Sequence, residues 1–218
     1  MMKGSMVWPK TAVHVLALLP FAWLLADIGY DRLGADPIAE LTHATGLWAL
    51  RFLLLALAVT PLRRITGWNV LARFRRMIGL YAFFYASVHL SIYLVLDLGG
   101  YWGQILEDIV KRPYITVGFA AWCGLLALAL TSTRGMMRRL GRRWTQLHRI
   151  VYGIGVLAVL HFWWLVKSDV REPAIYAGLL ALLLLLRLPP VARRIQRGIP
   201  PKPRAPAPAS ARRDQRGA

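Results

Sequence analysis

The sequence has a single cysteine and few acidic residues. Cys123 lies within an apolar run, so the chain can build neither a disulfide framework nor a thiolate metal cluster, and we interpret this residue as a small packing side chain. Aspartate and glutamate number 10 against 28 lysines and arginines, which gives a formal net charge of +18 over 218 residues. This positive charge needs an explanation of its own.

The high hydrophobicity excludes a soluble basic protein. Proteins that bind nucleic acid carry their charge on polar faces rich in lysine, whereas 57% of this chain is hydrophobic. The apolar residues form long runs, and the charges form short clusters between these runs. This arrangement is typical of a polytopic membrane protein, which has membrane lipid around it and no nucleic acid as a partner.

Six stretches predict membrane-spanning helices, because about 20 apolar residues cross the hydrocarbon core. The third and the fourth are the clearest, since charged residues enclose a full-length uncharged stretch in each. Arg51 interrupts the second, and the sixth is so short that Arg187 must reach the interface or the helix must continue toward Ala192. We predict an all-α, six-helix transmembrane bundle with spans at residues 11–29, 42–62, 77–96, 113–133, 150–166 and 173–188.

The basic clusters predict the orientation of these spans, because lysine and arginine accumulate on the cytoplasmic side of a membrane. The N-terminus, the second and fourth connections and the C-terminal tail contain nearly all of them, while the other connections contain most of the acids. Both termini are therefore predicted to be cytoplasmic. No small-x-small site closes the first apolar run, so we do not expect a cleaved signal peptide. The expected organisation is a cytoplasmic N-terminus at 1–10, a transmembrane domain at 11–188 and a basic, Pro/Ala-rich, disordered cytoplasmic tail at 189–218.

Two of the five histidines, His89 and His161, lie deep in predicted spans. Each lies eleven or twelve residues into its span, which places both roughly 17 Å from the cytoplasmic edge. Because the third and fifth spans run parallel, the two imidazoles can face each other across the core at one level. Such a pair can hold a haem iron from both faces, whereas a hydrogen-bonded neutral imidazole is the alternative for either one alone. A closed zinc site is not expected, since no further ligand lies at that depth.

His148 has three possible roles that the sequence leaves open. It precedes His161 on the same predicted helix and lies roughly 20 Å nearer the cytoplasm. The equivalent position on the third span is Arg76, so a second haem at His148 would have no histidine opposite. His148 is therefore a ligand of a second haem, a part of a quinone or flavin site, or a residue of a basic loop.

Three other residues of the spans are candidates for lesser roles. Arg51 needs an anion within the hydrocarbon, and a haem propionate competes with snorkelling of the side chain to the interface as the explanation. His14 lies near the cytoplasmic edge, where it could supply a ligand opposite His148. His43 lies at the periplasmic start of the second span, where a role at the helix end or in solvent is the simpler interpretation.

Several loop and span motifs carry a resemblance to a known family. With them the chain resembles the MsrQ (YedZ) family of haem-binding membrane subunits, within the ferric-reductase-like transmembrane superfamily, and the resemblance extends from about His14 to Leu188. The motifs are LGADP at 33–37, TPL at 60–62, RPYITVG at 112–118, LALTST at 128–133, LGRRWTQLHRIVY at 140–152 and IYAGLLALLLL at 175–185.

The resemblance implies a multi-pass protein of the bacterial inner membrane that holds haem b through His89, His148 and His161. Such a subunit takes electrons from the quinone pool or a flavin reductase. It passes them to MsrP, a periplasmic molybdenum-dependent methionine sulfoxide reductase that repairs oxidised proteins, so it is an electron-transfer subunit and not the catalytic one. The resemblance also implies FMN, without residues to hold it. In the wider superfamily two helices each carry two histidines, and Arg76 breaks this pattern, so one haem and two haems both stay open.

No GxGxxG motif follows the spans, so we expect no nicotinamide site in this chain. Two other classes of function compete with the haem hypothesis. A transporter that uses the same histidines would have broken helices and an internal repeat, and neither is visible in the sequence. A structural membrane anchor would tolerate loss of the histidines.

Overall fold

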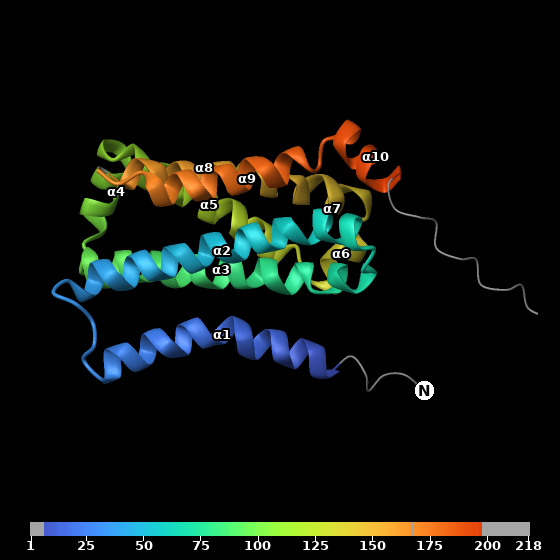
Figure 1. The fold of residues 1–218 in the computed structure, drawn as a ribbon. Coiled ribbons are helices and arrows are strands. Elements are labelled where there is room, and N and C mark those ends of the chain that lie inside the picture. The colour runs from blue at the N-terminus through green and yellow to red at the C-terminus, as the bar shows by residue number, and fades with distance from the viewer. Residues whose placement is uncertain (1–6, 167, 198–218) are drawn as a thin grey trace, which may run out of the picture.

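The computed structural model describes residues 7–166 and 168–197, and in this part of the chain the protein is helical without strands (Figure 1). Short helices gather at the two ends of a bundle of long ones, with α4 at one end and α6, α7 and α10 at the other (Figure 1). The long helices are α1 (Val7–Gly29), α2 (Pro37–Thr66), α3 (Arg75–Ile92), α5 (Pro113–Leu130), α8 (Val151–Leu165) and α9 (Arg171–Leu185). The short ones are η2 (Asn69–Arg73), the π-helix η3 (Tyr93–Asp97), α4 (Trp102–Lys111), α6 (Arg134–Leu140), α7 (Arg142–Leu147), η4 (His148–Ile150) and α10 (Pro189–Arg197).

Five helical segments of the described chain are long and apolar enough to cross a membrane. They agree with the first five predicted spans and cover Pro9–Gly29, Pro37–Thr66, Arg75–Asp97, Pro113–Leu130 and Arg142–Leu165. The sixth predicted span corresponds to α9, which has 15 residues and is therefore about 22 Å long, shorter than a hydrocarbon core of about 30 Å. Nevertheless α9 runs beside α8 from the end that carries α4 toward the end that carries α10 (Figure 1). The sixth span and the cytoplasmic termini stay predictions.

Helix α2 is the centre of the bundle. Its first turn is stabilised by Asp36, whose Oδ1 accepts a hydrogen bond from the amide of Ala39, and Pro37 follows where no amide hydrogen is needed. Gly67 ends the helix with a φ of 71°, a left-handed conformation that glycine adopts without strain. One core cluster joins α2 to α1, α3, α5 and α8, and a second joins it to α8 and α9. The site residues on α3 and α8 are therefore held against a common helix.

A single tyrosine makes two hydrogen bonds between helix α1 and this bundle. Tyr85 on α3 is fully buried, and its hydroxyl donates to the carbonyl of Ala17 at 2.7 Å while it accepts from the amide of Phe21 at 3.1 Å. These two backbone groups would pair with each other in a regular helix. Pro20 lies in the same turn and has no amide hydrogen. A second polar contact joins His14 Nδ1 to the Tyr81 hydroxyl at 2.7 Å.

The C-terminal part of the described chain bears on two sequence expectations. The predicted disordered tail includes residues 189–197, but these residues form α10, because Pro189 and Pro190 suit a first helical turn and Ala192 is buried where α10 packs against α2. For Arg187 the expectation was a side chain at the interface or a helix that continues toward Ala192, and the structure shows hydrogen bonds of this side chain within the protein. Its guanidinium donates to the Tyr152 hydroxyl at 2.9 Å and to the carbonyl of Leu57. The rest of the predicted tail, residues 1–6 of the predicted N-terminus, and Lys167 lie outside the described residues.

We predict that Tyr85→Phe lowers the melting temperature of the detergent-solubilised protein, measured by circular dichroism. The substitution removes the hydroxyl partner of a buried carbonyl and of a half-buried amide, at a cost of about 1–3 kcal/mol. Tyr81→Phe is the matched control on the same helix, since it removes one exposed hydrogen bond and should have a smaller effect. Equal melting temperatures for Tyr85→Phe and the unsubstituted protein would contradict the assigned role.

Candidate functional site

The structure brings the rings of His89 of α3 and His161 of α8 close together. Their ring centroids are 6.1 Å apart, and the ring planes are nearly perpendicular, at 81°. Each histidine lies about one turn before the C-terminal end of its helix, so the pair is nearer to the end of the bundle that carries α4 (Figure 1). This juxtaposition is the one that the equal depths of the two residues predicted.

Backbone carbonyl groups fix the protonation of both rings. Nδ1 of His89 is 2.8 Å from the carbonyl oxygen of Thr42, and Nδ1 of His161 is 2.7 Å from that of Tyr114. A carbonyl oxygen can only accept, so Nδ1 must carry the hydrogen in each ring, and in a neutral imidazole the lone pair is then on Nε2. Hydrogen bonds of this kind also orient a histidine that binds a metal and raise its basicity.

The pair fits a haem iron in donor type and in spacing. Histidine nitrogen binds metals at about 2 Å, so two imidazoles on opposite sides of one iron have their centroids roughly 6 Å apart. Nε2 of neither ring has a hydrogen bond within the described part of the chain, so both lone pairs are available. No group of three or more His, Cys, Asp or Glu residues suited to a metal ion occurs among the described residues. A haem needs only two such ligands because the macrocycle supplies the others.

His148 lies in η4, near the end of the bundle where α6 and α7 gather. Its Nδ1 is 3.1 Å from the carbonyl of Trp144, and its ring stacks on the indole of that residue with centroids 3.9 Å apart. Nε2 is 3.4 Å from the Ser132 hydroxyl oxygen. Arg76 Nη1 donates to the carbonyl of the same serine at 3.2 Å. Arg76 and His148 therefore approach one residue from two helices, and no second histidine completes a pair there.

A cavity of about 230 Å³ opens beside His148. Its walls are mostly apolar, and its polar lining consists of Arg75, Arg76, Ser132, Trp144 and His148. An adjoining cavity of about 280 Å³ shares Arg75, Trp144 and His148 with the first. Apolar walls with a few convergent polar groups are typical of a ligand site, and the arginines favour an anionic group on the ligand.

The other three candidates from the sequence, Arg51, His14 and His43, contact residues other than the histidine pair. Nε of Arg51 donates to the Tyr176 hydroxyl at 2.8 Å, and its guanidinium lies 4.9 Å from the centroid of the Trp48 ring. No carboxylate pairs with Arg51 in the described chain. His14 contacts Tyr81, as described above, and does not supply a ligand opposite His148 in this structure. His43 lies 3.9 Å from a carboxylate oxygen of Glu172 near the start of α9, which agrees with a role at the helix end.

One polar network near the pair was missed by the sequence analysis. Asp108 of α4 is buried, accepts a hydrogen bond from the Tyr93 hydroxyl at 2.7 Å, and lies 3.2 Å from Nε of Arg112. Tyr93 begins the π-helix that continues α3 one turn beyond His89. The network thus joins η3, α4 and the start of α5. Its sequence signal is the spacing of four residues between Asp108 and Arg112, which suits an ion pair on one face of a helix.

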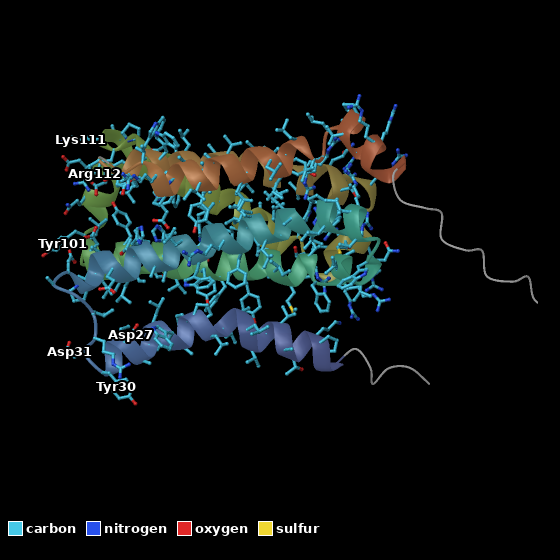
Figure 2. The ribbon with its side chains drawn as sticks, in the orientation of Figure 1. Asp27, Tyr30, Asp31, Tyr101, Lys111 and Arg112 are labelled. Carbon is cyan, nitrogen blue, oxygen red and sulfur yellow. The ribbon has the colours of Figure 1, made fainter. Side chains whose placement is uncertain are left out.

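Figure 2 shows Arg112 at the end of the bundle that carries α4. The other side chains labelled at this end are Asp27, Tyr30, Asp31, Tyr101 and Lys111 (Figure 2). Acidic residues are thus present here, whereas the arginine-rich helices α6 and α7 lie at the opposite end. This separation of charge agrees with the sorting of the connections by sequence.

The protein is a bundle of apolar helices with a histidine pair between α3 and α8, and this arrangement defines a class of membrane protein. Comparisons with known proteins identify the class. The family described as "Ferric reductase like transmembrane component" matches residues 45–159, more than half of the chain. The matched range contains His89 and His148 and ends just before His161. A multi-pass membrane protein is the class to which the fold and this match assign the chain.

Curated relatives narrow the class. The "Protein-methionine-sulfoxide reductase heme-binding subunit MsrQ" of Xanthomonas euvesicatoria pv. vesicatoria is 65% identical over 186 residues, which cover 83% of this chain and 85% of the relative. The protein of the same name from Rhodospirillum rubrum is 52% identical over 193 residues, which cover 88% and 93%. The chain belongs to the ferric-reductase-like transmembrane family and, within it, to the MsrQ heme-binding subunits. No solved structure matches it.

We predict that Asp108→Ala lowers the thermal stability by about 1–3 kcal/mol, because the Tyr93 hydroxyl loses its partner and Arg112 loses its ion pair. Glu107→Ala on the same helix is the matched control. Glu107 pairs with Lys111 over the same four-residue spacing, but both side chains are exposed, so its loss should cost less than about 1 kcal/mol. Thermal unfolding of the two variants tests this, and equal effects would contradict it.

Proposed function

We propose that the chain is a haem b electron-transfer subunit of a methionine sulfoxide reductase system in the bacterial inner membrane. The observation that carries the proposal is the pair of imidazoles, 6.1 Å apart, each with Nδ1 bound to a main-chain carbonyl. The names of the relatives support the same conclusion, since they describe a heme-binding subunit of a protein-methionine-sulfoxide reductase.

His89 and His161 are the proposed axial ligands of one haem. The haem iron supplies one-electron chemistry, because it is stable in both the ferrous and the ferric state. The chain holds the two imidazoles in one tautomer through the carbonyls of Thr42 and Tyr114, and its apolar helices keep water from the pair. Arg51 is the proposed partner of a propionate, since it is a cation within a spanning helix and has no carboxylate partner in the described chain.

The cavity at His148 is the proposed site of electron entry. Its volume of about 230 Å³ lies just below the range of about 300–1,000 Å³ for ligand pockets, so a quinone ring or the flavin of FMN fits more easily than a second haem. Trp144 provides a stacking surface, and Arg75 and Arg76 provide cations for an anionic group. The donor is then the quinone pool, or a flavin reductase that docks at the arginine-rich end.

The acceptor is proposed to be MsrP, a periplasmic, molybdenum-dependent reductase that repairs oxidised methionine in proteins. In this proposal α9 completes a six-span topology with cytoplasmic termini, and the end that carries α4 faces the periplasm. Because the histidine pair lies nearer to that end, electrons that enter at His148 leave toward the partner. The chain transfers electrons, and the chemistry on the substrate belongs to the partner.

We predict that the purified full-length protein, expressed with sufficient haem, has the absorption bands of a b-type cytochrome when reduced. His89→Ala and His161→Ala should each abolish the low-spin spectrum, because each removes one axial ligand. His14→Ala and His43→Ala should leave it unchanged, since these histidines have other partners. A colourless unsubstituted protein would exclude the proposal. A low-spin spectrum that survives His89→Ala and His161→Ala would place the haem elsewhere.

A second prediction concerns the cavity. A haem-to-protein ratio of one is expected for the unsubstituted protein and for His148→Ala, because His148 is not a ligand of the proposed haem. His148→Ala should instead slow reduction of the haem by a quinol or a reduced flavin, measured by stopped-flow absorbance. Two haems per chain, falling to one in His148→Ala, would show that His148 binds a second haem.

A further inference from the structure

Each ring of the histidine pair lies directly against a glycine of a neighbouring helix. A Cβ atom on Gly118 of α5 would come within 2.7 Å of Nδ1 and 2.8 Å of Cε1 of His161. A Cβ atom on Gly46 of α2 would come within 3.1 Å of the same two atoms of His89. Real side chains almost never approach below 3.0 Å, so any residue larger than glycine at position 118 must displace the ring.

Each glycine lies four residues after the residue whose carbonyl accepts the hydrogen bond from the histidine. Thr42 precedes Gly46 by four residues on α2, and Tyr114 precedes Gly118 by four residues on α5. In both cases the histidine follows its carbonyl acceptor by 47 residues. His89 therefore meets α2 in the same geometry in which His161 meets α5. No internal repeat is visible in the sequence, because the residues around these positions differ.

A four-residue spacing has a physical reason in helix geometry. In an α-helix the carbonyl of one residue bonds to the amide four residues later. Side chains tilt toward the N-terminus and cover the preceding turn, so the side chain at the later position shields the second lone pair of that carbonyl. Glycine at the later position leaves the carbonyl oxygen open to a second donor. Gly46 and Gly118 thus expose the carbonyls that the two Nδ1 atoms use.

We propose that Gly46 and Gly118 are positioning residues of the haem site. They admit the imidazoles to the carbonyls of Thr42 and Tyr114, and so turn both Nε2 atoms toward one iron. The inference rests on the proposed haem function and goes beyond it, because neither glycine touches the iron. Its consequence is that the orientation of the ligands is set by helices α2 and α5, which carry no ligand themselves.

The chain offers two controls that match the two test variants in the distance of the clash. A Cβ on Gly124, on the same helix as Gly118, would lie 2.8 Å from Ile154, and a Cβ on Gly155 would lie 3.1 Å from Leu180. Neither clash involves a histidine. Gly124→Ala is therefore the control for Gly118→Ala, and Gly155→Ala is the control for Gly46→Ala.

The experiment compares these four variants with the unsubstituted full-length protein, all purified in detergent after haem-replete expression. Gel filtration reports folding, and the readouts are the oxidised and reduced spectra, the haem midpoint potential and the binding of carbon monoxide to the reduced haem. We expect Gly118→Ala to lose the low-spin spectrum and to bind carbon monoxide, since His161 moves away from the iron. Gly46→Ala should show a shifted midpoint potential and partial carbon monoxide binding. Both controls should behave as the unsubstituted protein does.

The outcomes separate this inference from the proposed function. Unchanged spectra, potentials and carbon monoxide inertness in both Gly118→Ala and Gly46→Ala would overturn the inference while the haem function stands. The same spectral changes in Gly124→Ala and Gly155→Ala would also overturn it, since any tight glycine would then do the same. If Gly118→Ala does not fold, Gly46→Ala, which introduces a milder clash, tests the inference by itself. An unsubstituted protein without a histidine-dependent haem spectrum refutes the proposed function itself.

Discussion

A polar side chain inside the hydrocarbon must find its hydrogen-bond partner within the protein, because lipid offers none. This constraint explains the interactions that hold the bundle together. His89 and His161 donate to main-chain carbonyls of α2 and α5, and Tyr85 inserts its hydroxyl between two backbone groups of α1. Each of these bonds joins two helices, so the same contacts that satisfy the polar groups also fix the helices in place.

The histidine pair shows how this constraint produces a site. Once Nδ1 of each ring donates to a carbonyl, Nε2 carries the lone pair and can bind a metal. The carbonyl acceptors lie on α2 and α5, while the histidines lie on α3 and α8. Four helices therefore determine the positions of the two imidazoles. A fixed arrangement of this kind suits the proposed role in electron transfer.

The positions of the two histidines along their helices could be predicted from the sequence, whereas most of the contacts around them could not. Counting residues from the ends of the spans placed His89 and His161 at one depth, because helical rise is constant. By the same count Arg76 occupies the position expected for a fourth histidine, and in the structure both Arg76 and His148 contact Ser132. The network of Asp108, by contrast, was missed, since it depends on how α4 packs beside α5 and η3. Helix α10 was also missed, because a polar helix of nine residues is too short to be stable without the tertiary contacts that it makes with α2.

The sequence by itself determined that this is a multi-pass membrane protein, which segments are apolar enough to span, and how far along their helices the two histidines lie. These properties follow from composition and from length along a helix, so they need no knowledge of neighbouring helices. Only the tertiary structure decided which way each helix is rotated about its axis. Helix α8 is apolar on all sides, so its sequence indicates no preferred face. Packing against Gly118 and the carbonyl of Tyr114 sets the direction of His161, and that contact exists only when α5 and α8 lie together.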